Sequence, residues 1–495
     1  MELLKMKKAI RINENDNVAV ALTELKRGEE ILGIALLSDV PMGHKIALTD
    51  IGEGENVIKY GLPIGHTVKN IAAGEWVHTH NMKTNLEGEL EYTYCPKVEK
   101  LEPKTAPNFL GYRRESGEVG IRNEIWIIPT VGCVNDVAKA LVREAESLIG
   151  GSLEGIYAFP HPYGCSQTGD DHNTTKRLLG ALAKHPNAAG VLMLGLGCEN
   201  LTEAQMREEL GEFDSGRIKF LICQKTEDEI GDGMKLLEEL ADRAKKYKRE
   251  PIPASELKVG MKCGGSDGLS GITANPTVGK FSDLLISMGG TTVLTEVPEM
   301  FGAETLLMNR AENEEIFHKC VDMINSFKGY FISHGENVYE NPSPGNKNGG
   351  ITTLEDKSCG CVQKGGSAPV SDVIGYGERI KTKGLTLLSG PGNDLVSATA
   401  LTASGAHLVL FTTGRGTPFG APAPTMKIST NTALSEKKKS WIDFNAGTVA
   451  EGNDTPESAA MALMELVLEI ASGKKTRAEE SGYREIAIFK GGVTL

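Results

Sequence analysis

EIWIIPT (124–130), followed by VNDVAKALVREAESLI (134–149), decides the fold class of this chain. The first stretch reads as a buried strand and the second as an amphipathic helix. The apolar runs GIYAFP (155–160), AGVLMLG (189–195) and IKFLIC (218–223) follow. Continuous apolar runs are typical of parallel strands that are buried on both faces. Strands that alternate with helices favour βαβ units, so we predict an α/β domain with a parallel sheet.

The same alternation resumes further along the chain. ELKVGMKC (256–263), TTVLTEV (291–297), LTLLSG (385–390) and HLVLFTT (407–413) are strand candidates, with helical patterns between or beyond them. The charged segment ADRAKKYKREPIPASE (241–256) marks a boundary between two α/β parts.

The residues before these α/β parts follow a different pattern. From residue 8 onward, short β-like runs are broken by Gly and Pro, which predicts a small all-β module. PKVEKLEPKTAPNFLG (96–111) contains three Pro and mixed charges, as an extended linker does. We therefore predict a multidomain chain: an all-β domain at 1–95, a linker at 96–111, an α/β middle domain at 112–250 and an α/β C-terminal domain at 251–495.

The composition argues against several classes of protein. Of the 495 residues, 40% are hydrophobic and 24% charged, which is ordinary for a soluble globular chain. A net charge of −13 and an aromatic content of 5% argue against a nucleic-acid partner. We recognise neither a secretory signal nor an apolar run long enough to cross a membrane. Nine cysteines, an odd number, argue against a disulfide framework, so we expect a cytoplasmic protein with reduced thiols.

Cysteines recur where predicted strands end. Four apolar runs lead into a Gly-flanked cysteine: Cys133, Cys165, Cys198 and Cys263. In open α/β sheets, ligands bind beyond the carboxyl ends of the strands. Several thiols on one rim could therefore hold iron or an iron–sulfur cluster. The alternative is that each Cys is a small buried filler. LEDKSCGC (354–361) places two more thiols, Cys359 and Cys361, in what reads as a polar loop.

Histidines of the all-β module form a second group. WVHTHN (76–81) places His78 and His80 two residues apart, which on a strand puts both on one face. Such a pair can chelate a metal or hold a carboxylate. His44 lies in a Gly turn of the same module. A hydrogen-bonded pair at a sheet edge is the alternative interpretation.

A Gly-rich loop and an arginine are candidates for binding an anion. KCGGSDGLSGITANP (262–276) offers backbone N–H groups. It matches neither a Walker A loop nor a GxGxxG fingerprint, so nucleotide binding is unsupported. Arg415 in TGRGTP is the best candidate for a carboxylate clamp. Alternatively it pairs with an acid between two loops, and the next candidates are then Lys262, Lys357 and Lys364.

TEVPEMFGAE (295–304) brings three acids after a predicted strand. These acids, which suit hard metal ligands or a general base, are Glu296, Glu299 and Glu304. An ordinary helix start, where acids are favoured by the helix dipole, explains them equally well.

The strings GHKIALTDI, YGCSQ, GLGCEN, KCGGSDGLSGITANP, NPSPGNKNGGITTLEDKS and TGRGTPFG together resemble the altronate dehydratase family. That family also includes galactarate dehydratase and sulfolactate sulfo-lyase, and the resemblance covers nearly the whole chain. It implies an N-terminal SAF (β-clip) domain, a middle region that serves dimerisation, and a C-terminal Rossmann-like variant. It also implies a cytoplasmic homodimeric hydro-lyase of hexuronate breakdown, which converts D-altronate to 2-dehydro-3-deoxy-D-gluconate and water.

Candidate roles follow from this resemblance and from the residues together. The catalytic candidates are His44, His78, His80, Glu355 and Lys357. The substrate-binding candidates are Gly264, Gly265, Ser266, Asp267 and Arg415. The metal-ligand candidates are Cys133, Cys165, Cys198, Glu199 and Cys361. The resemblance implies Fe²⁺, replaceable by Mn²⁺, and an iron–sulfur cluster stays open. The family loop usually reads EDKSLGC, so Cys359 is an extra thiol in this chain.

Dehydration of a 2,3-dihydroxy acid sets clear chemical demands. It needs a base at C2, an electrophile at the carboxylate and an acid for the leaving hydroxide, and iron can serve as the Lewis acid. We expect the all-β module to close over this site. Galactarate or a sulfonated hydroxy acid is the alternative substrate, and a sugar-acid-binding protein without turnover is the alternative outside enzymes.

Overall fold

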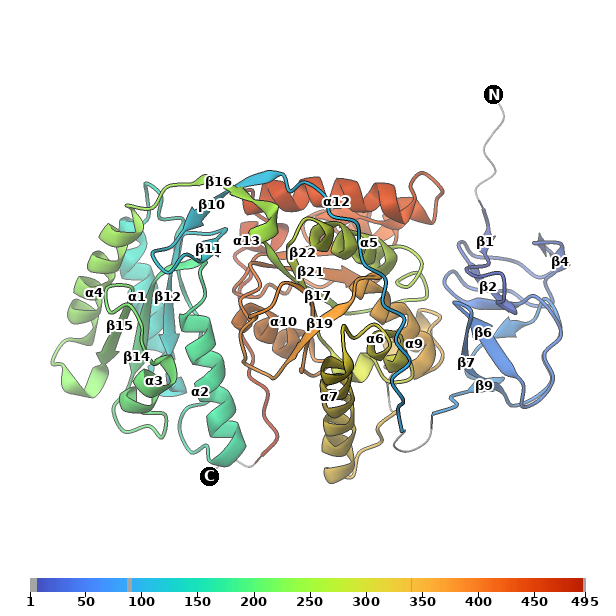
Figure 1. The fold of residues 1–495 in the computed structure, drawn as a ribbon, viewed down its shortest axis with the longest axis horizontal. Helices are drawn as coiled ribbons and strands as arrows, with labels where there is room; N and C mark the ends of the chain where they lie inside the picture. Colours follow the sequence, from blue (N-terminus) through green and yellow to red (C-terminus); the bar gives the residue numbers. More distant parts are fainter. Residues whose placement is uncertain (1–6, 87–90, 340, 493–495) are drawn as a thin grey trace.

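The computed structural model describes residues 7–86, 91–339 and 341–492, so residues 1–6 and 87–90 of the predicted first domain and residues 340 and 493–495 of the predicted last domain lie outside the described residues. An N-terminal β domain comes first, and Figure 1 shows it at one end of the molecule. Its first antiparallel sheet has the order β1-β2-β5-β8, with bounds Ala9–Ile10, Val18–Ala21, Lys45–Ala47 and Trp76–Val77. A second has the order β6-β7-β9, with bounds Asn56–Lys59, Leu62–Thr67 and Met82–Lys83. The hairpin of β3 (Glu30–Ile31) and β4 (Ile34–Ala35) completes the domain.

The middle part is a four-stranded parallel sheet in the order β13-β12-β14-β15. In chain order its strands are β12 (Glu124–Pro129), β13 (Gly155–Ala158), β14 (Ala188–Gly195) and β15 (Ile218–Ile222). Its helices are α1 (Asn135–Glu144), α2 (Gly169–Ala183), α3 (Glu203–Leu210) and α4 (Glu229–Ala244). Separate apolar clusters fill the two faces of the sheet, which explains why all eight residues of β14 are apolar or Gly and buried.

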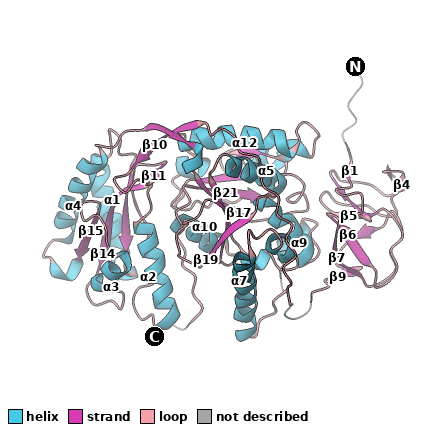
Figure 2. Cartoon of the chain, viewed as in Figure 1, coloured by secondary structure: helices cyan, strands magenta, loops and turns pink. Residues whose placement is uncertain are grey.

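The C-terminal part contains a seven-stranded parallel sheet in the order β19-β20-β18-β17-β21-β22-β23. Its strands are β17 (Lys258–Cys263), β18 (Thr291–Leu294), β19 (Val370–Ile374), β20 (Gly384–Leu388), β21 (Leu408–Thr413), β22 (Thr425–Ser429) and β23 (Phe444–Asn445). Its helices are α5 (Ala274–Ser287), α6 (Glu304–Met308), α7 (Glu314–Ser333), α8 (Pro344–Asn348), α9 (Leu354–Cys361), α10 (Asp394–Ala403), α11 (Thr432–Lys437), α12 (Pro456–Ala471) and α13 (Arg477–Glu480). Helices and strands alternate in Figure 2, as the apolar runs predict.

The order of strands reverses at one place in each parallel sheet. In the middle sheet the chain leaves β12 for β13 on one side and then returns to β14 on the other. In the C-terminal sheet the same reversal lies between β17 and β21. Loops diverge from each other at such a point, which leaves a crevice at the carboxyl ends of the strands. Each reversal is therefore the first place to look for a site.

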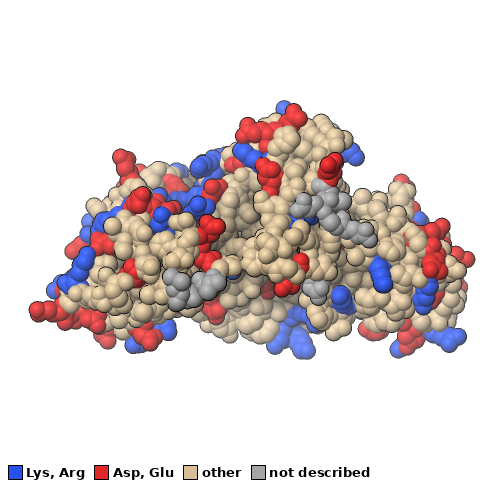
Figure 3. Space-filling model, turned by 90° about the horizontal axis from the view of Figure 1, so that it is seen from below, with Lys and Arg blue, Asp and Glu red and all other residues tan. Residues whose placement is uncertain are grey.

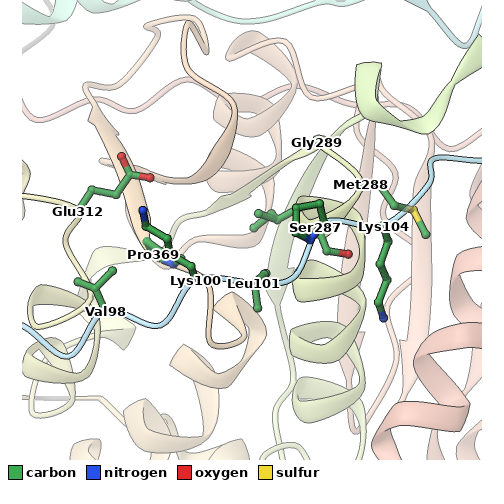
Figure 4. A pocket seen from close by; sticks show the side chains of 11 residues that line it. Val98, Lys100, Leu101, Lys104, Ser287, Met288, Gly289, Glu312 and Pro369 are labelled. Atoms are coloured by element: carbon green, nitrogen blue, oxygen red, sulfur yellow. The ribbon is translucent and has the colours of Figure 1, made fainter.

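Two segments connect the parts. β10 (Asn108–Arg113) pairs with β11 (Val119–Gly120) and β16 (Glu250–Pro253) in a small sheet between the two α/β parts. The segment predicted as a linker runs without helix or strand to residue 107 and crosses the C-terminal part, and its last residues enter β10 (Figure 1). A cavity of about 760 Å³ lies between this segment and the end of α5 (Figure 4). Its lining has no Cys or His and only one acid, Glu312, so its chemistry is sparse.

One predicted loop is a helix, and this prediction was wrong. LEDKSCGC forms α9, and all eight of its residues are buried. The Thr353 hydroxyl accepts a hydrogen bond from the Asp356 N–H and caps the helix. The polar composition of this segment predicts a solvated loop, but the polar side chains are buried against partners in the N-terminal domain. These partners lie about 300 residues earlier in the chain, so no local pattern reveals them.

Candidate active site

A pocket of about 370 Å³ opens at the reversal point of the C-terminal sheet. It is lined by residues at or just after the ends of β17, β18, β20 and β21, together with the loop before α9 and α9 itself. Those elements supply Cys263, Glu299, Asp394, Arg415 and Lys357. Thiol, carboxylate, guanidinium and ammonium groups therefore meet in one crevice.

A Cys–Glu–Cys group lies at the buried end of this pocket. The Sγ atoms of Cys263 and Cys361 are 3.4 Å apart. The Oε2 atom of Glu299 is 2.9 Å from the first sulfur and 3.2 Å from the second. Within the described part of the chain, this is the one group of three such residues whose ligand atoms all lie within 4.8 Å of one another. Two thiolates and a carboxylate form a donor set that suits a divalent transition metal ion.

Two buried lysines balance the charge of this group. The Nζ of Lys364 lies 2.9 Å from the Cys263 sulfur, and the Nζ of Lys357 lies 2.8 Å from Glu299 Oε1. Burial alone would raise the pKa of Glu299, but the two cations lower it to about 2. The hydrogen bond with Cys361 lowers the pKa of Cys263 to about 7, although burial opposes this. The site therefore favours the anionic forms of Glu299 and Cys263, whereas the hydrogen bond with Cys263 and burial raise the pKa of Cys361, whose thiol would have to lose its proton when a metal ion binds.

A second buried pair holds the end of β17 in place. Lys262 donates to Glu296 Oε1 at 2.8 Å and to Asp394 Oδ1 at 2.7 Å. The other Glu296 oxygen accepts from the Cys263 N–H at 2.8 Å. Glu296 has a left-handed backbone with φ of 70°, which a residue other than Gly or Asn rarely adopts. Such strain persists where the surroundings fix it, and here it turns the chain toward Glu299.

The outer wall of the pocket carries the predicted anion-binding residues. Arg415 is exposed, and no ion pair of its guanidinium exists among the described residues. Gly264, Gly265 and Ser266 line the same pocket, and Gly265 has a φ of 63°. Asp267 instead turns inward, where its carboxylate accepts from Ser270, Leu269 and Thr430 and pins the loop. The structure therefore places four of the five predicted substrate residues at the pocket.

The N-terminal domain is attached to α9 by buried charges. Asp356 accepts from Lys45 at 2.7 Å and from Lys59 at 2.9 Å, and the three side chains are almost fully buried. Lys45 also donates to Gly350 O and to Thr352 Oγ1. These lysine and aspartate charges cross the boundary between the two domains. They fix the N-terminal domain over the helix that carries Cys361 and Lys357.

Glu355 and Lys357, both predicted to be catalytic, lie at different surfaces of α9. Glu355 accepts from the Thr84 hydroxyl at 2.8 Å and from the Asn85 N–H at 2.7 Å, so it contacts the N-terminal domain. Lys357 faces the pocket, where it also donates to Asn341 and Asn346. Glu355 therefore connects the two domains, whereas Lys357 lines the pocket and can contact a bound substrate.

The predicted histidines gather around Trp76 rather than along a strand. β8 ends at Val77, so His78 and His80 lie in the following turn, and the expected pairing of both rings on one strand face was wrong. His78 Nδ1 lies 3.1 Å from Thr352 Oγ1, and His80 is exposed. Trp76 Nε1 donates to His44 Nδ1 at 3.1 Å. Burial lowers the pKa of His78 to about 3, and that of His44 in the same direction, so both rings are neutral.

The remaining predicted metal ligands lie elsewhere, at the carboxyl edge of the middle sheet. Cys133, Cys165 and Cys198 are exposed there and follow β12, β13 and β14. Glu199 is buried, and its carboxylate accepts from the Thr130 hydroxyl at 2.9 Å and the Leu196 N–H at 3.1 Å. The structure thus separates this group from Cys361, which lies at the end of α9 in the C-terminal part.

Some groups at the pocket were absent from the predicted set of site residues. Cys263 ends β17 and Glu299 follows β18; in the sequence this placement marks the thiol as a possible iron ligand and the acid as a possible hard metal ligand, although neither is among the final metal-ligand candidates. Asp394 begins α10 after the Gly-rich turn GPGN (390–393), a strand–turn–helix pattern of the same kind. Cys359, the extra thiol, packs in the apolar core, and burial raises its pKa to about 12.

Three family models match successive parts of the chain. Residues 7–85 match the altronate/galactarate dehydratase SAF domain. Residues 111–245 match the D-galactarate dehydratase/altronate hydrolase second domain. Residues 254–494 match the D-galactarate/altronate dehydratase C-terminal domain. The matched ranges follow the three parts of the fold.

Curated relatives are similar over nearly the full length. The chain is 54% identical to an altronate dehydratase of Bacillus subtilis (strain 168), across 99% of this chain and 100% of that relative. It is 54% identical to an altronate dehydratase of Escherichia coli (strain K12), across 98% of this chain and 99% of that relative. Identity falls to 34% with the galactarate dehydratase (L-threo-forming) of the same strain, across 97% and 96% of the two chains.

Proposed function

The chain belongs to the altronate/galactarate dehydratase family, and we propose that it is a hydro-lyase that removes water from D-altronate to give 2-dehydro-3-deoxy-D-gluconate. The observation that carries the proposal is the pocket that joins a buried Cys–Glu–Cys group to an exposed arginine. The identity of 54% to two altronate dehydratases, against 34% to a galactarate dehydratase, favours altronate over galactarate.

Ferrous iron fits the donor set of Cys263, Glu299 and Cys361, and we propose that these residues hold it. The fit rests on their chemistry: two sulfurs and a carboxylate oxygen converge, and two lysines offset their charge. When bound, the ion supplies a Lewis acid for the substrate oxygens. Mn²⁺, which prefers oxygen ligands, would suit this site less well.

The chain's own residues bind and orient the substrate. Arg415 offers two parallel N–H donors to a carboxylate, and no acid of the described chain neutralises it. The N–H groups of Gly265 and Ser266 have no hydrogen-bond partner in the described residues and can donate to substrate oxygens. The Lys357 ammonium, fixed between Glu299 and two asparagines, can stabilise charge on the leaving hydroxyl.

Asp394 is the best candidate for the base that takes the C2 proton. Its Oδ1 atom is held by Lys262, while Oδ2 has no partner among the described residues and the side chain is 35% exposed at the pocket. The ion pair fixes the direction of the carboxylate, as a proton acceptor requires.

The wider setting of the enzyme is also proposed. When β19 is left out and the other six strands are numbered in chain order, the strand order of the C-terminal sheet is 3-2-1-4-5-6, which supports a Rossmann-like variant.

Nine free cysteines support a reducing compartment, and we propose that the enzyme works in the cytoplasm. The family resemblance supports a homodimer formed through the middle part. On the face in Figure 3, acidic and basic side chains are interspersed, which gives no support to a nucleic-acid partner. In the described ranges, no helix combines the length and apolarity that a membrane span needs.

Anaerobic assays with iron and thiol test the function. We expect the 2-keto product from D-altronate, with a kcat/KM at least about tenfold above that for galactarate. A preference for galactarate would change the substrate within the family. Binding of both acids without any product would instead make the protein a sugar-acid-binding protein.

A further inference from the structure

We propose that the carboxyl edge of the middle sheet holds a second metal centre, an iron–sulfur cluster bound by Cys133, Cys165 and Cys198. This inference is independent of the pocket in the C-terminal sheet and of the reaction proposed there. Its starting point is a set of three exposed thiols, which is unusual because free Cys is among the most buried residue types.

The three loops that carry these thiols leave adjacent strands. β13, β12 and β14 are neighbours in the sheet and run parallel, so their carboxyl ends meet at one edge. This edge includes the reversal point between β12 and β14, where ligands bind in open α/β sheets. Cys133, Cys165 and Cys198 are the thiols that follow those strand ends.

Hydrogen bonds tie the loops to one another. The Gly132 N–H donates to Tyr163 O at 2.9 Å, which joins the first loop to the second. The Leu201 N–H donates to Gly164 O at 3.1 Å, which joins the third loop to the second. The buried Glu199 carboxylate accepts from Thr130 and so joins the third to the first. The loops therefore form one connected scaffold around the strand ends.

Glycine precedes each of the three cysteines and allows this close packing. Gly164 has a φ of 97°, and a Cβ there would lie 1.9 Å from Thr130 O. Gly197 has a φ of 127°, and a Cβ on Gly132 would meet His161 O at 3.0 Å. Ser166, directly after Cys165, is held in a left-handed conformation with φ of 57°. Strain of this kind gathers at binding sites, and here it serves to place the thiols.

Cys133, Cys165 and Cys198 are not among the residues whose ligand atoms all lie within 4.8 Å of one another, so they do not form a site for a single ion. Within the described residues, Cys263, Glu299 and Cys361 alone bring three such ligand atoms within 4.8 Å of one another. A cluster spans several iron atoms, so its thiolates stand farther apart than the ligands of one ion. Gln224 Nε2 also donates to Cys198 Sγ at 3.5 Å, and hydrogen bonds to sulfur tune cluster properties. The three thiolates would be the protein's ligands to the cluster, and each thiol would lose its proton on binding.

Cys223 provides a matched control on the same sheet. It follows β15, but it is half-buried and packs against the apolar cluster beneath α1 and α4. It also follows Ile222 rather than a glycine. The same edge therefore contains one thiol that faces the core and three that do not.

Reconstitution of the full chain tests the proposal. Protein purified anaerobically is treated with ferric iron, sulfide and excess thiol, and then desalted. We expect bound iron with acid-labile sulfide and a broad visible absorption. Cys133→Ser, Cys165→Ser and Cys198→Ser should each lose most of the labile sulfide, whereas Cys223→Ser and Cys361→Ser should retain it. Iron without labile sulfide in the wild-type chain, or equal sulfide in all variants, overturns the proposal.

Alkylation of the unmodified chain covers the case in which a variant fails to fold. Cys133, Cys165 and Cys198 are exposed and should react before reconstitution and be protected after it. Cys95, also exposed but just before the linker, should react in both states and is the internal control. Continued reaction of the three thiols after reconstitution would contradict the proposal. Labile sulfide in a protein that does not dehydrate altronate would leave this inference standing while the proposed function fails.

Discussion

The carboxyl edges of the two parallel sheets both collect cysteines, but they surround them differently. In the C-terminal sheet, Cys263 and Cys361 are buried beside a carboxylate, and two lysines balance the charge. In the middle sheet, three cysteines are exposed, and the buried acid nearby, Glu199, is occupied by Thr130 and backbone N–H groups. Strand order determines where ligands converge, whereas burial and charge determine which chemistry the converging groups can perform.

The largest effect should come from removing one sulfur of the buried Cys–Glu–Cys group at the carboxyl edge of the C-terminal sheet. Cys361→Ala should lower kcat/KM by about 10⁴-fold or more, the scale of losing a member of a catalytic unit. Cys359→Ala, two residues earlier in the same buried helix, removes a thiol that packs only in the core, so activity should remain near normal. Iron content and steady-state kinetics of both variants check this. Equal losses in the two would show that the helix, and not the sulfur, is what activity requires.

The next effect concerns the ion pairs that attach the N-terminal domain to α9, the helix that carries Cys361. Asp356→Asn leaves Lys45 and Lys59 buried without their counter-ion, which should lower the free energy of unfolding by about 3–5 kcal/mol. Asp39→Asn breaks an ion pair with Lys26 that is largely exposed, and stability should not change measurably. Urea unfolding followed by fluorescence of Trp76 and the other tryptophans measures both. A stable Asp356→Asn variant would mean that the other contacts across the boundary, such as those of Glu355 with Thr84 and Asn85, attach the domain without this ion pair.

A smaller effect is expected at the outer wall of the pocket. Arg415→Lys keeps the charge but loses the two parallel donors, so KM for altronate should rise about tenfold while iron content stays the same. The control is Arg477→Lys, which changes an exposed surface arginine of α13. If KM is unchanged and the protein loses iron or stability instead, Arg415 is structural. Lys357 then becomes the candidate for the carboxylate.

Much of the fold could be predicted from the sequence because each strand and helix carries its own local signal. The apolar runs from 155 to 223 became β13, β14 and β15. The buried site could not be predicted in the same way, since Cys263, Glu299 and Cys361 come from distant segments. No local pattern marks Asp356 as the partner of Lys45, about 300 residues away. Charged side chains that the sequence suggests are solvated can therefore be buried, because side chains of opposite charge from another domain pair with them.

The two edges should also respond differently to acid, and this gives the last and smallest prediction. The carboxyl edge of the C-terminal sheet contains the ion pair of Lys357 with Glu299, and this carboxylate, with its pKa lowered to about 2 by the lysines, stays ionised in mild acid. At the carboxyl edge of the middle sheet, a neutral imidazole holds the loop in place instead. His161 Nε2 donates to Pro129 O at 2.8 Å, and Nδ1 accepts from the Tyr163 N–H at 3.2 Å, so the ring joins the end of β12 to the loop that carries Cys165.

Burial lowers the pKa of His161 to about 4, against about 6.5 in the unfolded chain. Between these pH values the unfolded state binds a proton that the folded state does not. His161 therefore contributes stability in full above pH 6.5, and this is lost as pH falls toward 4, at about 1.4 kcal/mol per pH unit. His161→Gln should reduce the slope of unfolding free energy against pH by that amount, while the exposed His318→Gln should leave it unchanged. Because His407 and His185 are also buried with lowered pKa values, part of the slope should remain in the variant. An unchanged slope in His161→Gln would mean that His161 is already protonated in the fold, and the contrast between the two edges in acid would then disappear.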